Sequence, residues 1–278
     1  MSDSFSLSTS GVSLGFFLFT HMYTQPHIQL NQSQTSSRVL LPGNPGRVKE
    51  IACLLEKPVG LASNREFVSF GGFYKCKRIT VCSTGVGGPS TAIAVEELIA
   101  LGARVLIRVG TCGGAWRPNV PLGSLVIPTA CIRDEGTTKE YIDAEFPAVA
   151  DFKVVSKLRE SAKTNNVNYF IGINRSHDAY YGSQGSIVRW SKYLTDTRFQ
   201  NVDTPILSSE MECAALFVIA SLRNVTAGAV LAVNADPEPL RSRLEGKKQN
   251  VITENSTQKT KEVTKKAIRV ALDAIVKL

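Results

Sequence analysis

The chain has no hydrophobic run long enough to cross a membrane. Its most apolar early segment, residues 12–20 (VSLGFFLFT), is much shorter than the about 20 residues that a membrane-spanning helix needs. A secretory signal would require a Lys or Arg before its apolar segment, and none precedes residues 12–20. We therefore expect no membrane partner and a cytoplasmic protein.

The chain also has no C-x-x-C pair, although it contains six cysteines. They are Cys53, Cys76, Cys82, Cys112, Cys131 and Cys213, and most of them stand in apolar or glycine-rich surroundings. This pattern argues against a disulfide framework and a zinc site. It predicts buried free thiols in a reducing compartment.

No block of like charge is present, although 32 Lys and Arg against 24 Asp and Glu leave a formal net charge of +8. The densest group of lysines, in residues 247–266, is interleaved with glutamates, so we interpret it as the solvated faces of a loop and a helix. We expect no nucleic-acid partner, and the positive charge could instead serve an anionic small substrate. The 12 prolines and 21 glycines are too few for a collagen-like or low-complexity chain.

Strand-like and helix-like segments alternate after a Ser- and Thr-rich N-terminal tail, residues 1–26. Strands are expected at 39–41, 79–82, 105–109, 125–127, 169–173 and 227–233. Helices are expected at 47–55, 90–101, 154–164, 210–222 and near the C-terminus, where Val263, Ile268, Leu272 and Ile275 share one face, and a polar loop is expected at 174–188. This alternation predicts one α/β domain, residues 27–278, with a mainly parallel sheet.

Binding sites in such folds lie at the carboxyl ends of the strands. The candidate site residues are therefore Gly43 and residues 85–90, 110–114 and 234–236, which follow or end expected strands. Residues 85–88 (GVGG) follow a strand, but Ser90 occupies the third glycine position of a dinucleotide fingerprint, and no acidic residue ends a strand about 20 residues later. No GxxxxGK[ST] sequence occurs, which excludes a P-loop nucleotide triphosphatase.

Glycine turns paired with arginines are present instead. Residues 42–47 (PGNPGR) place flexible backbone beside Arg47, which could cradle an oxyanion or could be an ordinary surface turn. Arg108 follows the apolar residues 105–107 on an expected central strand, where a buried arginine needs an anionic partner. Arg65 is either a similar group or a partner of Glu66.

Several longer motifs resemble one known family. They are residues 42–47, 61–67 (LASNREF), 82–102, 108–113 (RVGTCG), 145–152 (EFPAVADF) and 210–212 (EME). With them, the chain from His27 to its C-terminus resembles the nucleoside phosphorylase-I family, which includes uridine phosphorylases and hexameric-type purine nucleoside phosphorylases. The resemblance is strongest to bacterial uridine phosphorylases, and residues 27–34 also resemble apicomplexan purine enzymes. It implies a three-layer α/β/α fold around a central mixed, mainly parallel twisted sheet.

The resemblance also implies a reaction, the reversible phosphorolysis of a nucleoside to free base and ribose 1-phosphate, with phosphate as co-substrate and no organic cofactor. It implies that Arg108 and Glu212 are catalytic. The implied phosphate-binding residues are Gly43, Arg47, Arg65, Arg108 and Thr111, and the implied ribose-binding residues are His27, Glu210, Met211 and Glu212. Arg65 and His27 would reach into a neighbouring subunit, which implies a homodimer or a hexamer built as a trimer of dimers. Glu66, Val86 and Ser90 match a potassium site at the dimer interface.

The ribose candidates have simpler explanations as well. Ser209 and Glu212 could form a capping box at a helix start, and Glu210 could be a second carboxylate at that helix N-terminus. Met211 could belong to the core, and His27 could be a surface histidine.

The base pocket departs from the family pattern. Where uridine phosphorylases have Phe-Tyr-x-Gly-Gln-x-Arg, Tyr180 can supply the aromatic face and Gln184 the amide, but the arginine position holds Ser186. A second arginine position holds Ala235. Hexameric-type purine enzymes have an aspartate near that place, and the base-binding candidates here are Tyr180, Gln184, Asn234 and Asp236.

We therefore expect uridine as the substrate, with a 6-oxopurine nucleoside such as inosine or guanosine as the alternative. Two other classes stay open, an inactive paralogue that binds nucleosides and a nucleic-acid-binding protein.

Overall fold

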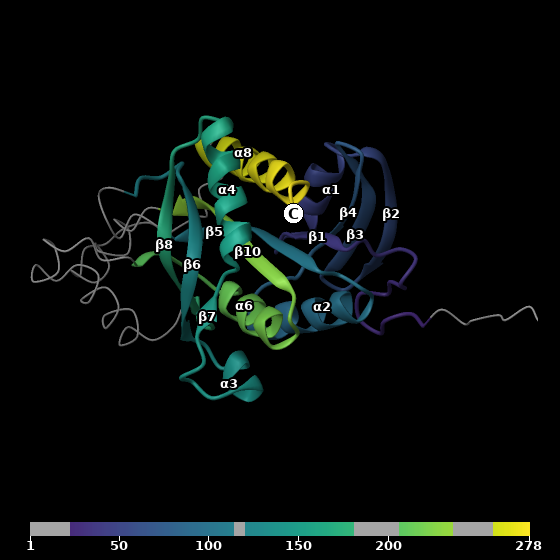
Figure 1. The fold of residues 1–278 in the computed structure, drawn as a ribbon, viewed down its shortest axis with the longest axis horizontal. Helices are drawn as coiled ribbons and strands as arrows, with labels where there is room; N and C mark the ends of the chain where they lie inside the picture. Colours follow the sequence, from purple (N-terminus) through teal and green to yellow (C-terminus); the bar gives the residue numbers. More distant parts are fainter. Residues whose placement is uncertain (1–22, 114–119, 181–205, 236–257) are drawn as a thin grey trace, which may run out of the picture.

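The computed structural model describes residues 23–113, 120–180, 206–235 and 258–278 (Figure 1). The strands are β1 (Arg38–Leu41), β2 (Glu56–Asn64), β3 (Phe67–Tyr74), β4 (Lys77–Cys82), β5 (Val105–Gly113), β6 (Leu125–Asp134), β7 (Ala148–Val149), β8 (Tyr169–His177), β9 (Ile206–Glu210) and β10 (Thr226–Ala235). The helices are α1 (Pro45–Ala52), α2 (Gly88–Ala100), α3 (Thr137–Tyr141), α4 (Phe152–Thr164), α6 (Cys213–Leu222) and α8 (Gln258–Ile275). Residues 1–22, most of the expected tail, lie outside the described ranges.

The strands form one sheet in the order β10-β6-β8-β9-β5-β1-β4-β3-β2. Strands β4, β1, β5 and β10 are mutually parallel at its centre, and antiparallel pairs continue it on both sides. Because β10 also pairs with β5, the strands β5, β10, β6, β8 and β9 close into a ring. The ring places Ser209 of β9 opposite Gly113 at the end of β5.

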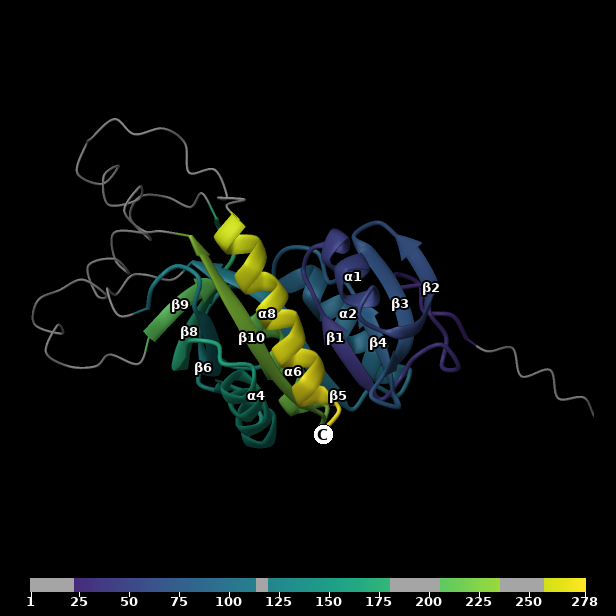
Figure 2. The ribbon, with the colours of Figure 1, turned by 90° about the horizontal axis from the view of Figure 1, so that it is seen from above.

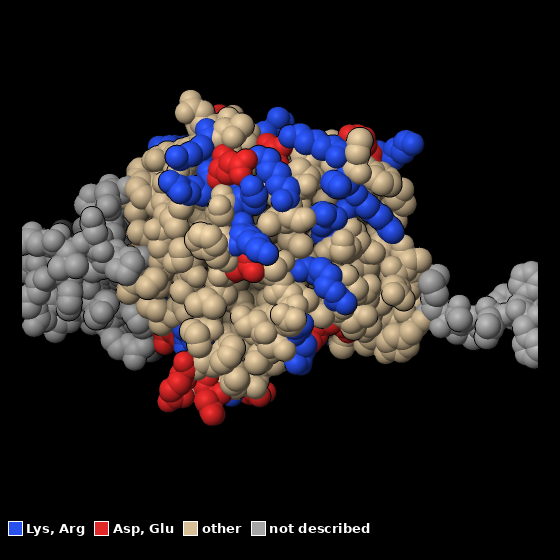
Figure 3. Space-filling model, in the orientation of Figure 1, with Lys and Arg blue, Asp and Glu red and all other residues tan. Residues whose placement is uncertain are grey.

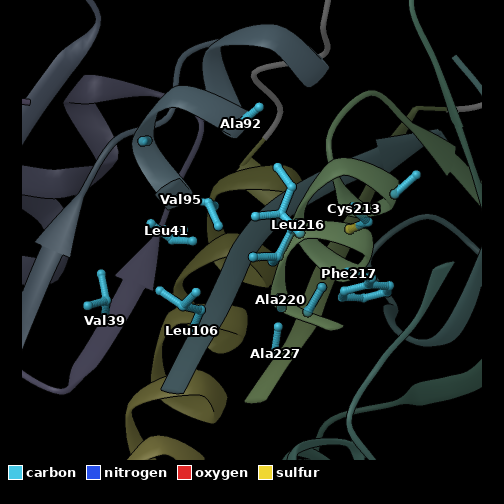
Figure 4. Close-up of a cluster of buried hydrophobic side chains, with 14 of the residues drawn as sticks. Val39, Leu41, Ala92, Val95, Leu106, Cys213, Leu216, Phe217, Ala220 and Ala227 are labelled. Atoms are coloured by element: carbon cyan, nitrogen blue, oxygen red, sulfur yellow. The ribbon is translucent and has the colours of Figure 1, made fainter. Parts of the chain in front are cut away.

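Helices cover both faces of the sheet, as the three-layer expectation requires (Figures 1 and 2). Side chains alternate between the faces along each strand. On β5, Leu106 packs in the core layer with α2 and α6, whereas Ile107 packs in the layer with α1, α4 and α8. Figure 4 shows part of the first layer, with Leu106 near Val95 of α2 and Leu216 of α6. The α/β class with a central mixed sheet is therefore confirmed.

The terminal helix matches its expectation, because the four residues predicted to share one face are all buried: Val263, Ile268, Leu272 and Ile275. The lysines of α8 are exposed, and Lys and Arg side chains spread over the face that carries α1, α4 and α8 (Figure 3). Acidic residues are interleaved with them, since Asp273 pairs with Lys75 and Glu160 pairs with Lys157 and Lys277. Of the helices in the described ranges, none has both the length and the apolar character to span a membrane.

The hairpin of β2 and β3 was not expected from the sequence. Strand β2 is largely exposed and contains Pro58 and Gly60, so it has neither the alternation nor the residue types of a typical strand. Its position at the edge of the sheet tolerates both residues.

Three other expectations are wrong. Residues 174–177 continue β8 rather than beginning a loop, and the rest of the expected loop lies mostly outside the described ranges. The helix expected from residue 210 starts at Cys213, because residues 206–210 form β9 and pair with β8. Cys53 and Cys76 are exposed, although the other four cysteines are buried and all six are free thiols.

Candidate functional site

The turns that follow β1 and β4 meet beside Arg108 of β5. The amide of Gly85 donates to the carbonyl of Gly43 (3.1 Å). A Cβ atom added to Gly43 would lie 3.0 Å from the carbonyl oxygen of Gly85 and 3.7 Å from both terminal nitrogens of Arg108. A side chain at position 43 would therefore crowd the guanidinium, and glycine leaves the backbone open to it.

Arg47 and Thr111 join the same end of the sheet. Arg47 of α1 donates from Nη1 to the carbonyl of Val109 on β5 (3.1 Å). Thr111 is half-buried three positions after Arg108 on β5. Four of the five predicted phosphate-binding residues therefore lie on or just after the neighbouring strands β1 and β5, whereas Arg65 lies in the turn between β2 and β3.

Arg108 is almost completely buried, with an exposed fraction of 4%. Its Nη2 atom donates to Glu212 Oε2, and its Nε atom lies 3.3 Å from Glu210 Oε2. Burial acts to lower the pKa of Arg108, but the two carboxylates outweigh it and raise the pKa above its ordinary value. Nη1 has no hydrogen-bond partner among the described residues. The anionic partners that the sequence required are Glu212 and Glu210.

Glu212 precedes α6, and its side chain turns away from that helix. Its Oε1 atom accepts from the amide of Gly87 (2.7 Å), at the start of α2. Burial, with the neighbouring Glu210, raises the pKa of Glu212 above its ordinary value despite the opposing charge of Arg108. The hydroxyl of Ser209 has no partner among the described groups, so the alternative that Ser209 and Glu212 form a capping box is wrong.

Glu210 ends β9 and is fully enclosed by donors. Its Oε2 atom accepts from the amides of Glu212 (2.9 Å) and Cys213 (2.9 Å) at the start of α6. Burial acts to raise the pKa of Glu210, but Arg108 and the hydrogen bonds outweigh it and hold the pKa below its ordinary value. Of the two roles left open by the sequence, this geometry favours the carboxylate at a helix N-terminus.

A comparison with known proteins identifies the family. The model of the phosphorylase superfamily matches residues 37–277. The chain belongs to this superfamily. It is 44% identical to the uridine phosphorylase of Treponema pallidum over 74% of this chain and 80% of that protein. It is 33% identical to the guanosine phosphorylase of Halorubrum lacusprofundi over 92% of this chain and 100% of that protein. A crystal structure of uridine phosphorylase from Vibrio fischeri superimposes with a TM-score of 0.78 at 33% identity, covering 94% of this chain and 100% of that chain.

Two predicted residues of this phosphorylase chain lie apart from Arg108. His27 is held by Glu97 of α2, which accepts from His27 Nδ1 at 2.6 Å and from the backbone amides of His27 and Ile28. His27 lines a cavity of about 630 Å³ along α2 and α3. Arg65 is exposed at the hairpin turn between β2 and β3, with a φ of 52°. It forms no ion pair with Glu66, so that alternative is wrong, and neither Arg65 nor His27 is bonded to Arg108 or Glu212 within the described chain.

The three residues matched to a potassium site do lie together. Ser90 Oγ donates to the carbonyls of Val86 (3.1 Å) and Gly87 (3.3 Å). A Cβ atom added to Gly85 would meet Ser90 Oγ at 3.2 Å and Glu66 Cγ at 2.6 Å, so these side chains flank one glycine. A carboxylate, a carbonyl and a hydroxyl supply the oxygen ligands that hard cations prefer.

The base-binding candidates are only partly placed. Tyr180 follows β8 and is 49% exposed, and Asn234 of β10 is half-buried. Gln184 and Asp236 lie outside the described residues. Met211, between the two glutamates, is half-buried rather than part of the core.

Sequence reasoning missed Asn174 and Ser176, two fully buried polar residues of β8 that donate to Glu210. Their spacing of two along the chain was an available signal, because alternate polar residues on a strand share one face.

Proposed function

We propose that this chain is a uridine phosphorylase, which converts uridine and inorganic phosphate reversibly to uracil and ribose 1-phosphate. The observation that carries the proposal is the buried Arg108, which is paired with Glu212, lies beside the backbone of Gly43 and keeps one terminal nitrogen unbonded among the described residues. The 44% identity to a uridine phosphorylase supports the choice of substrate.

Phosphate binds between the β1 turn and β5 in this proposal. The amide of Gly43, the guanidinium groups of Arg47 and Arg108, and the hydroxyl of Thr111 hold its oxygens. Such preorganised donors stabilise charge without reorganising during the reaction, and they act most strongly where water is excluded. Arg108 serves as the central donor because it is the buried one.

Ribose binds over Met211, with its 2′- and 3′-hydroxyls donating to Glu212. As the glycosidic bond breaks, C1′ gains oxocarbenium character, and phosphate must stand on the opposite face of the ring. Positioning therefore supplies much of the rate enhancement. The Arg108–Glu212 pair spans the two subsites, so it can hold phosphate and sugar in register.

In this proposal Tyr180 and Gln184 contact the base, and these residue types favour uracil. A second substrate class, the 6-oxopurine nucleosides, is favoured by the 33% identity to a guanosine phosphorylase over nearly the whole chain. In that case Asn234 or Asp236 would contact the purine. Ser186 and Ala235 occupy the places of two base-reading arginines, which is why an inactive nucleoside-binding paralogue is the alternative of another class.

Arg65 and His27 complete the site of a neighbouring subunit in a homodimer or a hexamer, which accounts for their distance from Arg108. Glu66, Val86 and Ser90 would share a potassium ion between two copies. Residues 27–278 form the catalytic domain behind the tail, and the free cysteines are compatible with a cytoplasmic location.

A base-release assay tests the function. Uridine, thymidine, inosine and adenosine are each incubated with and without inorganic phosphate, and free base is measured. We expect saturable, phosphate-dependent release that is fastest with uridine. Fastest release from inosine would establish the purine alternative. No release from any nucleoside, with binding retained, would establish the inactive paralogue. Binding of nucleic acid that weakens steeply with salt would point to the third class.

A further inference from the structure

The carboxylate of Glu210 is held by side chains from a neighbouring strand that no substrate can reach. Asn174 Nδ2 donates to Glu210 Oε1 at 2.8 Å, and Ser176 Oγ donates to the same oxygen at 2.6 Å. Both donors come from β8 and have no exposed surface. They therefore act on the site only through other residues.

Glu210 in turn contacts both Arg108 and the backbone that carries Glu212. Its Oε2 atom faces Arg108 Nε at 3.3 Å and accepts from the amides of Glu212 and Cys213, which set the direction of the backbone just before α6. Ser176 makes a second connection, because its hydroxyl accepts from the amide of Ala214 at 2.9 Å. Strand β8 thus fixes both the guanidinium of Arg108 and the turn that carries Glu212.

The bonding capacity of Glu210 is already filled. A carboxylate has about four lone-pair positions, and here two side-chain donors and two backbone amides occupy them, while Arg108 Nε faces the carboxylate at 3.3 Å as its counter-ion. A buried carboxylate with fewer donors would carry a desolvation penalty and would be free to rotate. The full set of donors therefore holds the Glu210 side chain in one orientation and leaves it no free position to accept from sugar hydroxyls.

We propose that Asn174 and Ser176 are positioning residues of the phosphorylase site, which hold Arg108 and Glu212 in register through the carboxylate of Glu210. This inference rests on the proposed function, since Arg108 and Glu212 are the groups that would contact phosphate and ribose. Glu210 belongs to the same positioning unit.

Ser176→Ala tests the proposal, with Ser161→Ala as the matched control. Ser161 is also a fully buried serine, but it lies in α4 and its hydroxyl has no partner among the described residues. Rates are measured with phosphate varied at saturating uridine and with uridine varied at saturating phosphate. We expect Ser176→Ala to lower kcat/KM about tenfold for both substrates, the scale of one lost hydrogen bond to a charged group. The control should match the wild type.

A double-mutant cycle identifies the route of the effect. If Ser176 acts through Glu210, Ser176→Ala should add little to the loss already caused by Glu210→Gln, whereas independent effects would multiply. Multiplying effects, or a lower melting temperature with unchanged kcat and KM per folded enzyme, would overturn the proposal and leave Ser176 a structural residue.

A second variant and a binding measurement keep the test decisive if Ser176→Ala does not fold or if the wild-type protein shows no phosphorolysis. If Ser176→Ala does not fold, Ser208→Ala replaces it, because Ser208 Oγ donates to Asn174 Oδ1 at 2.9 Å and orients that amide. A loss of about threefold is then expected, and no loss overturns the proposal. A wild-type protein that releases no base from any nucleoside contradicts the proposed function instead. In that case phosphate-dependent thermal stabilisation, compared between Ser176→Ala and Ser161→Ala, still tests the positioning of Arg108.

Discussion

The guanidinium of Arg108 and the carboxylate of Glu212 form a buried ion pair that joins the middle of β5 to the start of α6. Their side chains are 5% and 6% exposed. Each is the other's charged partner, and each is also proposed to bind one of the two substrates. In the proposed reaction, phosphate would therefore bind to a guanidinium that is already oriented, and ribose would meet a carboxylate that is already fixed.

Arg108→Ala should lower kcat/KM for phosphorolysis by about 10²-fold or more, the scale of losing one preorganised charge-stabilising donor. It should also lower stability by about 3–5 kcal/mol, because Glu210 and Glu212 lose their buried counter-ion. Steady-state kinetics and thermal unfolding measure the two effects. Arg108→Lys keeps the charge but loses the fork of donors, so it should recover more of the stability than of the rate. Near-normal turnover by Arg108→Ala would mean that phosphate binds elsewhere.

Asp273 of α8 should make a pH-dependent contribution to the stability of the fold. Burial acts to raise the pKa of Asp273, but hydrogen bonds from Lys75 (2.6 Å), Asn165 (3.0 Å) and Tyr74 (3.0 Å) hold it below its ordinary value. A carboxyl with a lowered pKa stabilises the fold above its unfolded pKa of about 4, and this contribution is lost as the pH falls through the folded value. Asp273→Asn should therefore lower the melting temperature at pH 7, and this difference from the wild type should shrink as the pH is lowered toward 3.

The control for this pH dependence is Glu262→Gln on the exposed face of α8. Within the described part of the chain the Glu262 side chain bonds only Gln258, with no basic partner. We expect almost the same melting temperature as the wild type at both pH values. An Asp273→Asn difference that persists unchanged at pH 3 would show that packing, rather than charge, explains its effect.

The core of the fold could be predicted from the sequence because its signals are local. Apolar runs such as residues 105–107 and the 3.6-residue period of α8 need no knowledge of distant partners. Strand β9 (ILSSE) could not be predicted in the same way. It is short and polar, and it is a strand because the ring sets it between β8 and β5.

The same distinction applies to the site. The cost of burying Arg108 on a strand predicted anionic partners, and Glu210 and Glu212 are those partners. The sequence predicts a polar loop over residues 174–188, which includes Asn174 and Ser176. Their role depends on a carboxylate more than 30 residues away, and only the pairing of β8 with β9 brings it near.

Gly228→Ala should destabilise the protein without affecting its chemistry. A Cβ atom at this position of β10 would lie 2.4 Å from Val154 Cγ1 and 3.1 Å from Val154 Cβ in α4, so the helix would have to move. We expect a loss of about 1–3 kcal/mol in unfolding free energy, typical of overpacking, with kcat unchanged at low temperature. Gly60→Ala is the control, since its nearest neighbour would be 3.6 Å away in the Phe70 ring. Equal stability of the two variants would contradict this account of α4 packing.

Ser186→Arg tests which base the pocket reads. If the pocket binds uracil, the new guanidinium should raise kcat/KM for uridine, because a charged donor stabilises the departing pyrimidine anion better than a neutral amide alone. Kinetics with uridine and inosine are compared, and Ser186→Lys controls for charge without the planar fork. A gain with inosine only, or a wild type that already prefers inosine about tenfold, would support the purine alternative.

The last prediction is that each site is completed by a second copy of the chain. Arg65 is exposed at the tip of the β2–β3 hairpin and is not bonded to Arg108 or Glu212 within the described chain. If it serves a neighbour across a two-fold axis, a mixed dimer of Arg65→Ala and Glu212→Ala chains has one site with both lesions and one with neither. Mixing the two inactive variants under conditions that exchange subunits should restore about a quarter of wild-type activity.

Each variant incubated alone under the same exchange conditions is the control, and it should stay inactive because every site keeps its lesion. The exchange itself is followed with two differently tagged chains, so that a negative result has a meaning. If exchange is complete and no activity returns, each chain builds its own site, and the exposed Arg65 acts only in the hairpin. Recovery, in contrast, requires that the arginine and the glutamate of one working site come from different chains, because no single chain in the mixture carries both.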